Sequence, residues 1–196
     1  MRIDAVMPEF DATRVEHRVI DASVERVYRA VCEADFVDAP NENRAVRFLF
    51  ALRTSIERLV ARLRGRPISH EEETSWRLAD MGASGDWIAL GEHPPHEFAF
   101  GAIGRFWGGE TTWRQSDASE FASFAEPGFA RIACNLSLRP YGGGRTLVSY
   151  EARTQATDPQ ARRAFLRYWR LVSPMVGVVM RSGLSVVARE ARRQAP

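Results

Sequence analysis

The sequence predicts an α+β domain in which a curved antiparallel sheet of about seven strands wraps around one long C-terminal helix, with two further helices near the N-terminus. Strand-like patterns follow one another from residue 86 to residue 154 with no helical pattern between them, which is typical of an antiparallel meander. An apolar stripe at helical spacing then runs from residue 159 to about residue 193. A helix of that length, about 50 Å at 1.5 Å per residue, can cover one face of the sheet.

The first predicted strand covers Thr13–Ile20, where Val15, His17 and Val19 alternate with charged residues as in an edge or half-buried strand. Ser23 can cap a helix directly after it, because the next apolar residues recur at helical spacing. The strand therefore runs almost directly into a short helix.

A second helix is predicted over Asn43–Arg64, because its apolar residues form one stripe and its other face carries arginines. The next segment, Ser69–Leu78, fits two structures. Ser69 and Glu72 can form a capping box, whereas the alternation at its end is typical of a strand. We expect a short helix there.

Turn-forming Pro and Gly residues divide the meander into strands. The segment Pro140–Gly144 indicates an antiparallel hairpin between the last two strands. On the first strand of this hairpin, alternate residues from Ala130 to Leu138 are apolar and share one face, so the opposite face is expected to be wet. The strands expected in the meander cover residues 86–92, 97–107, 111–115, 120–124, 129–139 and 145–154.

Asp158 and Pro159 predict the start of the final helix, as an N-cap and a proline at the first helical position. Pro174 lies inside the helix and removes one hydrogen bond, so we expect a kink. Gly177 and Gly183 lower the helix propensity and permit close approach of another surface.

The composition fits a single domain over residues 1–196. Hydrophobic residues make up 45% of the chain and charged residues 27%, which excludes a disordered chain. A chain of this length can bury about 70% of its unfolded surface, so its core needs no disulfide or metal. Cys32 and Cys134 show no metal-ligand spacing, so both are expected to be reduced thiols, and no cofactor or metal is expected.

The charge pattern argues against a dedicated nucleic-acid binder. All 27 basic residues are Arg, and 25 acidic residues leave a net charge of +2. No signal-peptide pattern opens the chain, and Pro174, Arg181 and Gly183 interrupt the apolar run Leu171–Val187. We therefore expect a soluble, cytoplasmic protein without stable membrane insertion.

Four stretches carry a resemblance to a known family: Val19–Ser23 with Val27-Tyr28, then Gly101–Trp107, Phe124–Phe129 and Arg163–Trp169. On these stretches the chain resembles a bacterial branch of the SRPBCC superfamily. These START-like or helix-grip proteins include polyketide cyclases, plant pathogenesis-related proteins and lipid-transfer domains. The resemblance covers nearly the whole chain and implies a helix-grip fold with an apolar cavity between the sheet and the last helix. It implies no single function, because members bind many ligands and only some catalyse reactions.

Large apolar residues on the strands and the last helix are the candidate lining of that cavity, with ordinary core packing as the alternative for each. Arg105 and His17 are candidates for a polar rim, with a plain surface position as the alternative. The facing of Trp87 and Trp113 is left open, because a one-residue shift in register would move each to the other side of the sheet. The candidate ligand-binding residues are Ile88, Leu90, Phe98, Phe100, Phe106, Ile132, Leu136, Val148, Tyr150, Met175 and Val179.

Other polar groups have simple alternative explanations. Glu151, Arg153 and Arg131 could bind an anion, although opposite charges on paired strands commonly form a surface ladder. His93 and His96 flank a Pro pair, which favours an exposed turn over a metal site. The arginines of the last helix could contact phosphate or acidic lipid, or could form a solvated face. They are Arg162, Arg163, Arg167, Arg170, Arg189, Arg192 and Arg193.

The favoured function is binding or transport of a small hydrophobic molecule, such as a lipid, a polyketide or an aromatic metabolite. A cyclase-like or aromatase-like enzyme is the first alternative, with Tyr150, His17 or Arg105 assisting proton transfer in the same cavity. An interaction module that uses the basic last helix is the second. The patterns GxSxG, HExxH and the P-loop do not occur in the sequence, so no catalytic residue is predicted. A homodimer is left open.

Overall fold

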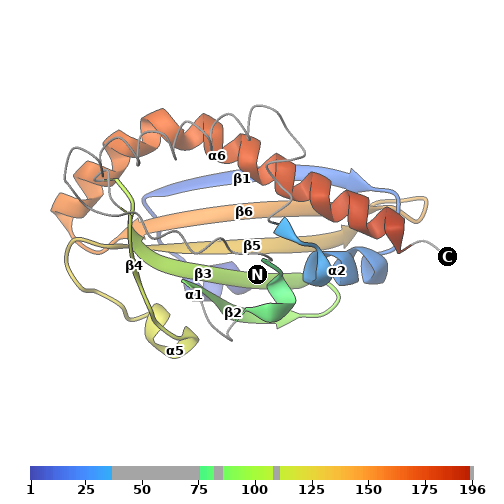
Figure 1. The fold of residues 1–196 in the computed structure, drawn as a ribbon, viewed down its shortest axis with the longest axis horizontal. Helices are drawn as coiled ribbons and strands as arrows, with labels where there is room; N and C mark the ends of the chain where they lie inside the picture. Colours follow the sequence, from blue (N-terminus) through green and yellow to red (C-terminus); the bar gives the residue numbers. More distant parts are fainter. Residues whose placement is uncertain (37–75, 82–85, 108–110, 195–196) are drawn as a thin grey trace, which may run out of the picture.

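The computed structural model describes residues 1–36, 76–81, 86–107 and 111–194. These residues form the predicted α+β architecture, in which a curved antiparallel sheet carries a long C-terminal helix in a helix-grip arrangement (Figure 1). The strands are β1 (Ala12–Ile20), β2 (Trp87–His93), β3 (Glu97–Arg105), β4 (Thr112–Arg114), β5 (Ala130–Pro140) and β6 (Thr146–Ala156). The helices are α1 (Arg2–Val6), α2 (Val24–Glu33), α5 (Ala118–Phe121) and α6 (Pro159–Arg193), with a one-turn 3-10 helix, η2 (Leu78–Asp80).

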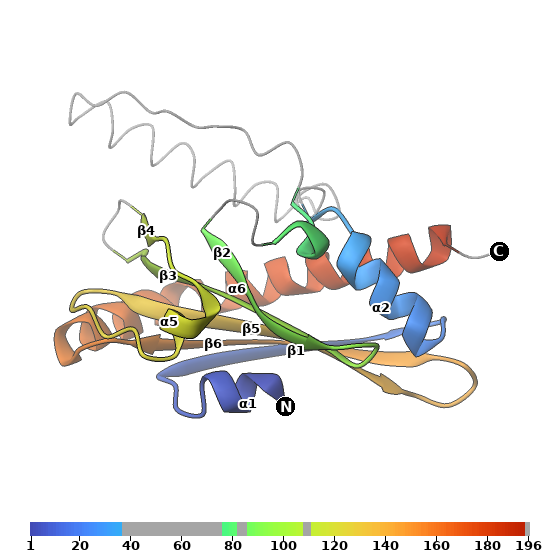
Figure 2. The same ribbon diagram turned by 90° about the horizontal axis from the view of Figure 1, so that it is seen from below.

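The sheet has the strand order β1-β6-β5-β3-β2, and β4 pairs with the end of β3. All of these pairings are antiparallel, as the predicted meander requires. Figure 2 shows α1 on one side of the sheet, and α2 and α6 on the other. We call the side under α2 and α6 the helix face, and the opposite side the outer face.

The strand predicted over residues 120–124 is wrong, and the described sheet has six strands rather than seven. The chain forms the short helix α5 there because Asp117 caps it. The Asp117 carboxylate accepts hydrogen bonds from the backbone N–H groups of Ser119 and Glu120, at 2.8 and 3.0 Å. Phe121, at the end of this turn, is fully buried against the outer face.

The prediction for α2 is confirmed. Ser23 caps the helix by accepting a hydrogen bond from the backbone N–H of Arg26, at 3.4 Å. Tyr28, on its buried side, donates a 2.6 Å hydrogen bond from Oη to Glu92 and so joins α2 to β2. Burial and this carboxylate raise the pKa of Tyr28 well above its usual range.

The predicted helix over Asn43–Arg64 lies outside the described residues, as does all but the end of the Ser69–Leu78 segment. The described end of that segment leads into η2, where Leu78 is buried in the helix-face core. Helix α1 had no sequence signal, and its residues Ile3 and Met7 pack on the outer face.

Helix α6 begins and continues as predicted. The Asp158 carboxylate caps it, accepting hydrogen bonds from the backbone N–H groups of Gln160 and Ala161 at 2.7 and 2.9 Å. The helix runs through Pro174 without interruption and follows a curved path over the sheet (Figure 1). By length and composition α6 could cross a membrane, yet most of its last third is packed into the helix-face core.

Each face of the sheet has its own hydrophobic core. The helix-face core joins α2 and α6 to alternate residues of β3, β5 and β6. The outer-face core is smaller and joins α1 and α5 to β2, β3 and β5. Its buried members are Ile3, Met7, Leu90, Ala99, Ile103, Phe121 and Ala133.

Polar contacts attach α6 to the edge strand β1. The alternation of β1 turns its charged residues toward α6 and leaves Val15, His17 and Val19 exposed on the outer face. Glu16 accepts hydrogen bonds from Arg14 at 2.6 Å and forms an ion pair with Arg181 of α6 at 2.8 Å. These partners lower the pKa of Glu16 even though burial acts in the opposite direction.

Gly177 makes this polar seam possible. A Cβ atom at Gly177 would lie 2.6 Å from an Arg14 guanidinium nitrogen and 2.7 Å from the Glu16 carboxylate. About two turns after Gly177 in α6, Ser185 Oγ accepts a 2.7 Å hydrogen bond from Arg18 of β1. The close approach predicted for Gly177 is therefore confirmed.

Candidate ligand-binding site on the helix face

A connected row of aromatic rings crosses the helix face, and we call it the aromatic belt. Neighbouring ring centroids lie 5.2 to 6.4 Å apart, mostly in tilted or edge-on arrangements. All five tryptophans of the chain belong to it. The belt consists of Phe36, Trp76, Trp87, Phe98, Phe100, Phe106, Trp107, Trp113, Tyr150, Phe165, Tyr168 and Trp169.

The pairing of the strands brings these rings together. Phe100 of β3 lies opposite Ala89 of β2, which places Trp87 on the same face two residues earlier. Trp113 of β4 lies opposite Gly104 of β3. A Cβ atom at Gly104 would be 2.5 Å from the Trp113 ring, so the glycine provides the space for the indole. Trp87 and Trp113 therefore both lie on the helix face.

The belt has a buried base and a partly exposed surface. Phe100 and Phe165 are 1% and 0% exposed. In contrast, Trp76, Trp87 and Trp113 are only partly buried in the structure. Large rings that stay accessible beside a packed core provide apolar area for another apolar molecule.

The polar groups at the base of the belt are a tyrosine and a thiol. Tyr150 Oη donates a hydrogen bond to Cys134 Sγ over 4.0 Å. Burial raises the pKa of Cys134 to about 12 and raises that of Tyr150 well above its usual range. Both groups are therefore neutral at pH 7, and the pair can donate a hydrogen bond but cannot act as a base.

Most of the predicted lining residues share the helix face. Phe98, Phe100, Leu136 and Val148 are buried in its core, with Ile132 and Tyr150 packed against them. Phe106 contacts Trp113 and Tyr168 within the belt. On α6, Met175 and Val179 are partly exposed.

Ile88 and Leu90 lie on the outer face, so their predicted grouping with Phe98 and Phe100 does not match the structure. Ile88 lies opposite Gly101, one residue out of phase with Phe100. An irregularity in the pairing at Ala89–Gly91 follows, and Leu90 packs with Ile3 and Phe121.

The two predicted rim residues lie away from the belt. His17 is exposed on the outer face, where its Nδ1 lies 2.8 Å from Ser149 Oγ. Arg105 is exposed at the end of β3, in the opposite phase to Gly104 and Trp113. The sheet therefore separates His17 from the belt and does not bring the two rim residues together.

The charged groups considered for an anion site hold the outer face together instead. Arg153 binds the Glu151 and Asp4 carboxylates, both at 2.7 Å, and the Met7 carbonyl at 2.9 Å. Burial lowers the pKa of Arg131, which donates to the carbonyls of α5 and to Gln155. Arg153 thus fixes α1 to the sheet, and Arg131 fixes α5.

His93 and His96 are exposed at the turn between β2 and β3, with their rings stacked 6.0 Å apart. Within the part of the chain that the structure describes, no group of three His, Cys, Asp or Glu side chains could hold a metal ion. The histidine pair therefore lies in a solvent-facing turn of the kind that the neighbouring prolines predict.

The sequence reasoning missed several belt residues, most clearly Trp76, Trp113, Phe165 and Tyr168. The sequence signal that these residues share is local composition. Tryptophan and phenylalanine are concentrated in and around the edge strands and at the start of the last helix. Their facing depends on strand register and on how β4 pairs with β3, which a single sequence does not specify.

No family model matches the chain, and no curated protein matches it. Solved structures do align with it over most of its length. A conserved protein from Geobacillus kaustophilus aligns with 93% of this chain and 96% of its own, with 9% identity and a TM-score of 0.45. The alignment with protein MLL2253 from Mesorhizobium loti covers 94% of this chain and 100% of that protein, with 13% identity and a TM-score of 0.42.

CalU16 from Micromonospora echinospora covers 92% of this chain and 84% of its own, with 13% identity and a TM-score of 0.30. Scores in this range assign neither a ligand nor a reaction to the chain.

Proposed function

We propose that this protein binds or transports a small hydrophobic molecule on the helix face, between the sheet and α6. The observation that carries the proposal is the aromatic belt, in which partly exposed rings lie over a buried base. The resemblance of the sequence to SRPBCC proteins supports the same location. A lipid, a polyketide or an aromatic metabolite would satisfy such a surface, and flat aromatic ligands would gain additional ring contacts.

The expected affinity follows from the area that a ligand can bury. Removing about 300 Å² of apolar ligand surface from water contributes roughly 7 kcal/mol, at about 25 cal/mol per Å². The entropic cost of association reduces this figure, so binding in the micromolar range is the upper limit we expect for apolar contacts alone. Because Tyr150 Oη donates its proton to Cys134 Sγ, it would orient a ligand by accepting a hydrogen bond from an O–H or N–H group.

The polar groups favour binding over acid–base catalysis. A cyclase-like reaction needs at least two ionisable groups that can exchange protons near pH 7. Tyr150 and Cys134 are held neutral by burial, and Glu16 on the same face is held by Arg14 and Arg181. A carrier or binding protein is therefore the function that we propose first, and the cyclase-like enzyme is the alternative.

The proposal is tested by titrating the full chain with N-phenyl-1-naphthylamine, a neutral apolar dye whose emission rises in apolar surroundings. Ile132→Ala removes a partly buried side chain from the helix face, and Ile88→Ala removes the matching side chain from the outer face. Loss of about 1 kcal/mol of apolar contact should weaken dye binding about fivefold in Ile132→Ala. Ile88→Ala should bind like the wild-type protein.

Thermal unfolding of both variants controls for stability, because both isoleucines are partly buried. Equal weakening by the two variants, or a wild-type protein that binds no apolar dye, would contradict the proposed site.

A further inference from the structure

The side of α6 opposite the buried Phe165 carries a stripe of exposed residues, which we call the α6 stripe. It consists of Arg163, Arg167, Arg170, Leu171 and Pro174, and all five are exposed. Successive members of the stripe are four, three, one and three residues apart, and this spacing places them on one side of the helix. Phe165, which is 0% exposed, lies on the opposite side.

The stripe has an excess of positive charge. From residue 159 to residue 189, α6 contains six Arg and no acidic residue. Arg162 and Arg181 are neutralised by Asp11 and Glu16, at 2.6 and 2.8 Å. The stripe arginines differ from these two, because no ion pair joins them to an acidic side chain of the described residues.

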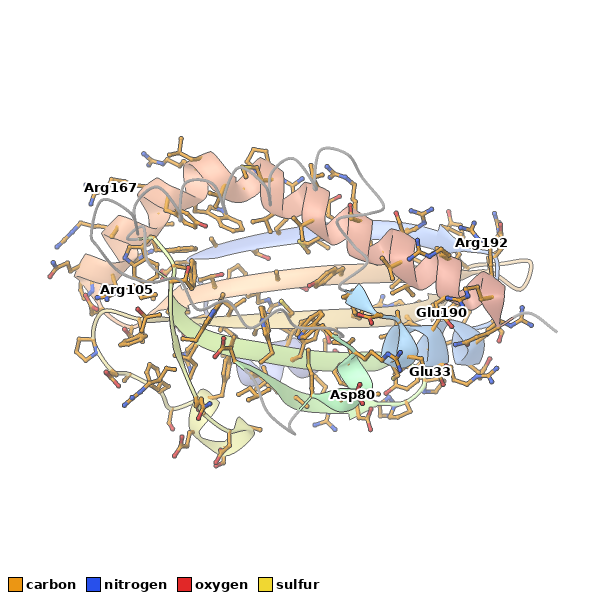
Figure 3. All side chains as sticks on the ribbon, viewed as in Figure 1. Glu33, Asp80, Arg105, Arg167, Glu190 and Arg192 are labelled. Carbon is orange, nitrogen blue, oxygen red and sulfur yellow. The ribbon has the colours of Figure 1, made fainter. Side chains whose placement is uncertain are left out.

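Among the described residues, the side chains of Arg167 and Arg170 have no hydrogen bond or ion pair, and Arg163 interacts electrostatically with the helix cap Asp158. Figure 3 shows Arg105 at the same end of the molecule as Arg167. The labelled Glu33 and Glu190 lie at the other end, together with Arg192.

An apolar segment directly follows these arginines. Residues 171–180 contain no charged side chain, and only Gly177 and Met180 among them are buried. Leu171 is 78% exposed, the highest value among the exposed large hydrophobic residues. Residues 182–191 of the same helix are mostly buried, so the exposed apolar character is confined to the middle of α6.

We propose that the α6 stripe docks the protein on an anionic lipid surface, with the helix lying parallel to the membrane. Arginines beside exposed leucine and proline, on a helix that a fold holds at its surface, are typical of interfacial binding. An anionic lipid surface matches both features of the stripe, because lipid headgroups attract the arginines and the acyl boundary takes up the exposed leucine and proline. The proposal does not depend on the proposed ligand, since the stripe faces away from the belt.

The test is co-sedimentation of the full chain with vesicles of phosphatidylcholine alone, or of phosphatidylcholine mixed equally with phosphatidylglycerol. Wild-type protein should bind the mixed vesicles and lose binding as salt rises. The double variant Arg167→Gln/Arg170→Gln should bind about fivefold more weakly for each arginine removed. Leu171→Gln should also weaken binding to the mixed vesicles. The control variant Arg139→Gln/Arg192→Gln makes the same change in net charge at exposed positions outside the stripe, and it should bind as the wild type does.

Three results would overturn the proposal. The first is equal binding to both kinds of vesicle, and the second is equal loss in the two double variants. The third is a protein that ignores vesicles but forms a dimer that Leu171→Gln dissociates, because the stripe would then be an interface between two copies. None of these results bears on dye binding at the belt, so failure of one proposal is distinguishable from failure of the other.

Discussion

The two faces of the sheet use their side chains in opposite ways. On the outer face, Arg131 and Arg153 are surrounded by carboxylates and carbonyls, and each fixes a helix to the sheet. On the helix face, large rings remain partly exposed, and the polar pair beneath them is neutral. Satisfied charges hold a structure together, whereas exposed apolar area at a rigid base is available to a ligand. Satisfied charges therefore fasten the outer face, and the helix face carries the proposed binding surface.

The largest expected effect comes from breaking the outer face. Arg153→Ala leaves the Glu151 carboxylate, the Asp4 carboxylate and the Met7 carbonyl without their partner. Because Arg153 is only 8% exposed, we expect a loss of about 3 kcal/mol in the free energy of unfolding. Urea denaturation of the variant and the wild-type protein measures this loss in the free energy of unfolding. Dye affinity of the folded fraction should be unchanged, and a large loss of affinity would mean that the faces are not independent.

Two glycines of β3 compare the faces directly. In Gly104→Ala the new methyl group meets the Trp113 ring at 2.5 Å, and in Gly101→Ala it meets the Ile132 carbonyl at 2.6 Å and Leu90 at 2.7 Å. Both variants should lose about 2 kcal/mol of stability through overpacking. Only Gly104→Ala should change tryptophan fluorescence and dye affinity strongly, because only it displaces a belt ring. Similar spectra for the two variants would argue against the belt geometry.

High pH should weaken the helix face. The pKa of Cys134 is raised to about 12 in the folded protein, above the value of 9.0 for a free thiol, so the folded state keeps a proton that the unfolded chain releases. The free energy of unfolding should therefore fall as pH rises from about 9 toward 12, by up to about 1.4 kcal/mol per pH unit for this group. Urea denaturation at several pH values gives the slope. Cys134→Ala should flatten it, and an unchanged slope in that variant would contradict the burial of the thiol.

The smallest effect is expected at His17. Its ring is exposed on the outer face and contacts Ser149, so His17→Ala should change stability by less than about 0.5 kcal/mol. Dye binding should not change, because the sheet lies between His17 and the belt. Equilibrium unfolding and dye titration check both statements, and a strong loss of binding would place His17 in the site after all.

The sequence predicts the fold where local signals agree with the final structure. Capping residues such as Ser23 and Asp158 mark the starts of α2 and α6, and the Gly-rich turn after Pro140 marks the last hairpin. The prediction fails at residues 120–124, where the Asp117 carboxylate caps a short helix in place of the expected strand.

The candidate site is less predictable than the fold, because it depends on which way each strand faces. Phe98, Phe100 and Tyr150 follow from regular alternation. Ile88 and Leu90 do not, because the register of β2 against β3 places Ile88 opposite Gly101 and so turns Ile88, and Leu90 two residues later, to the outer face. Trp113 reaches the belt only because Gly104 leaves it room across a short pairing between β3 and β4.

The location of the tryptophans provides the most direct test of the binding face. Each of the five indole N–H groups gives its own signal in a proton–nitrogen correlation spectrum, and all five belong to the belt. Titration with N-phenyl-1-naphthylamine should shift the indole signals of Trp76, Trp87 and Trp113, while the side-chain methyl signals of Ile88 and Leu90 in a proton–carbon correlation spectrum stay in place. Shifts confined to the outer face, with unmoved indole signals, would contradict a ligand site on the helix face.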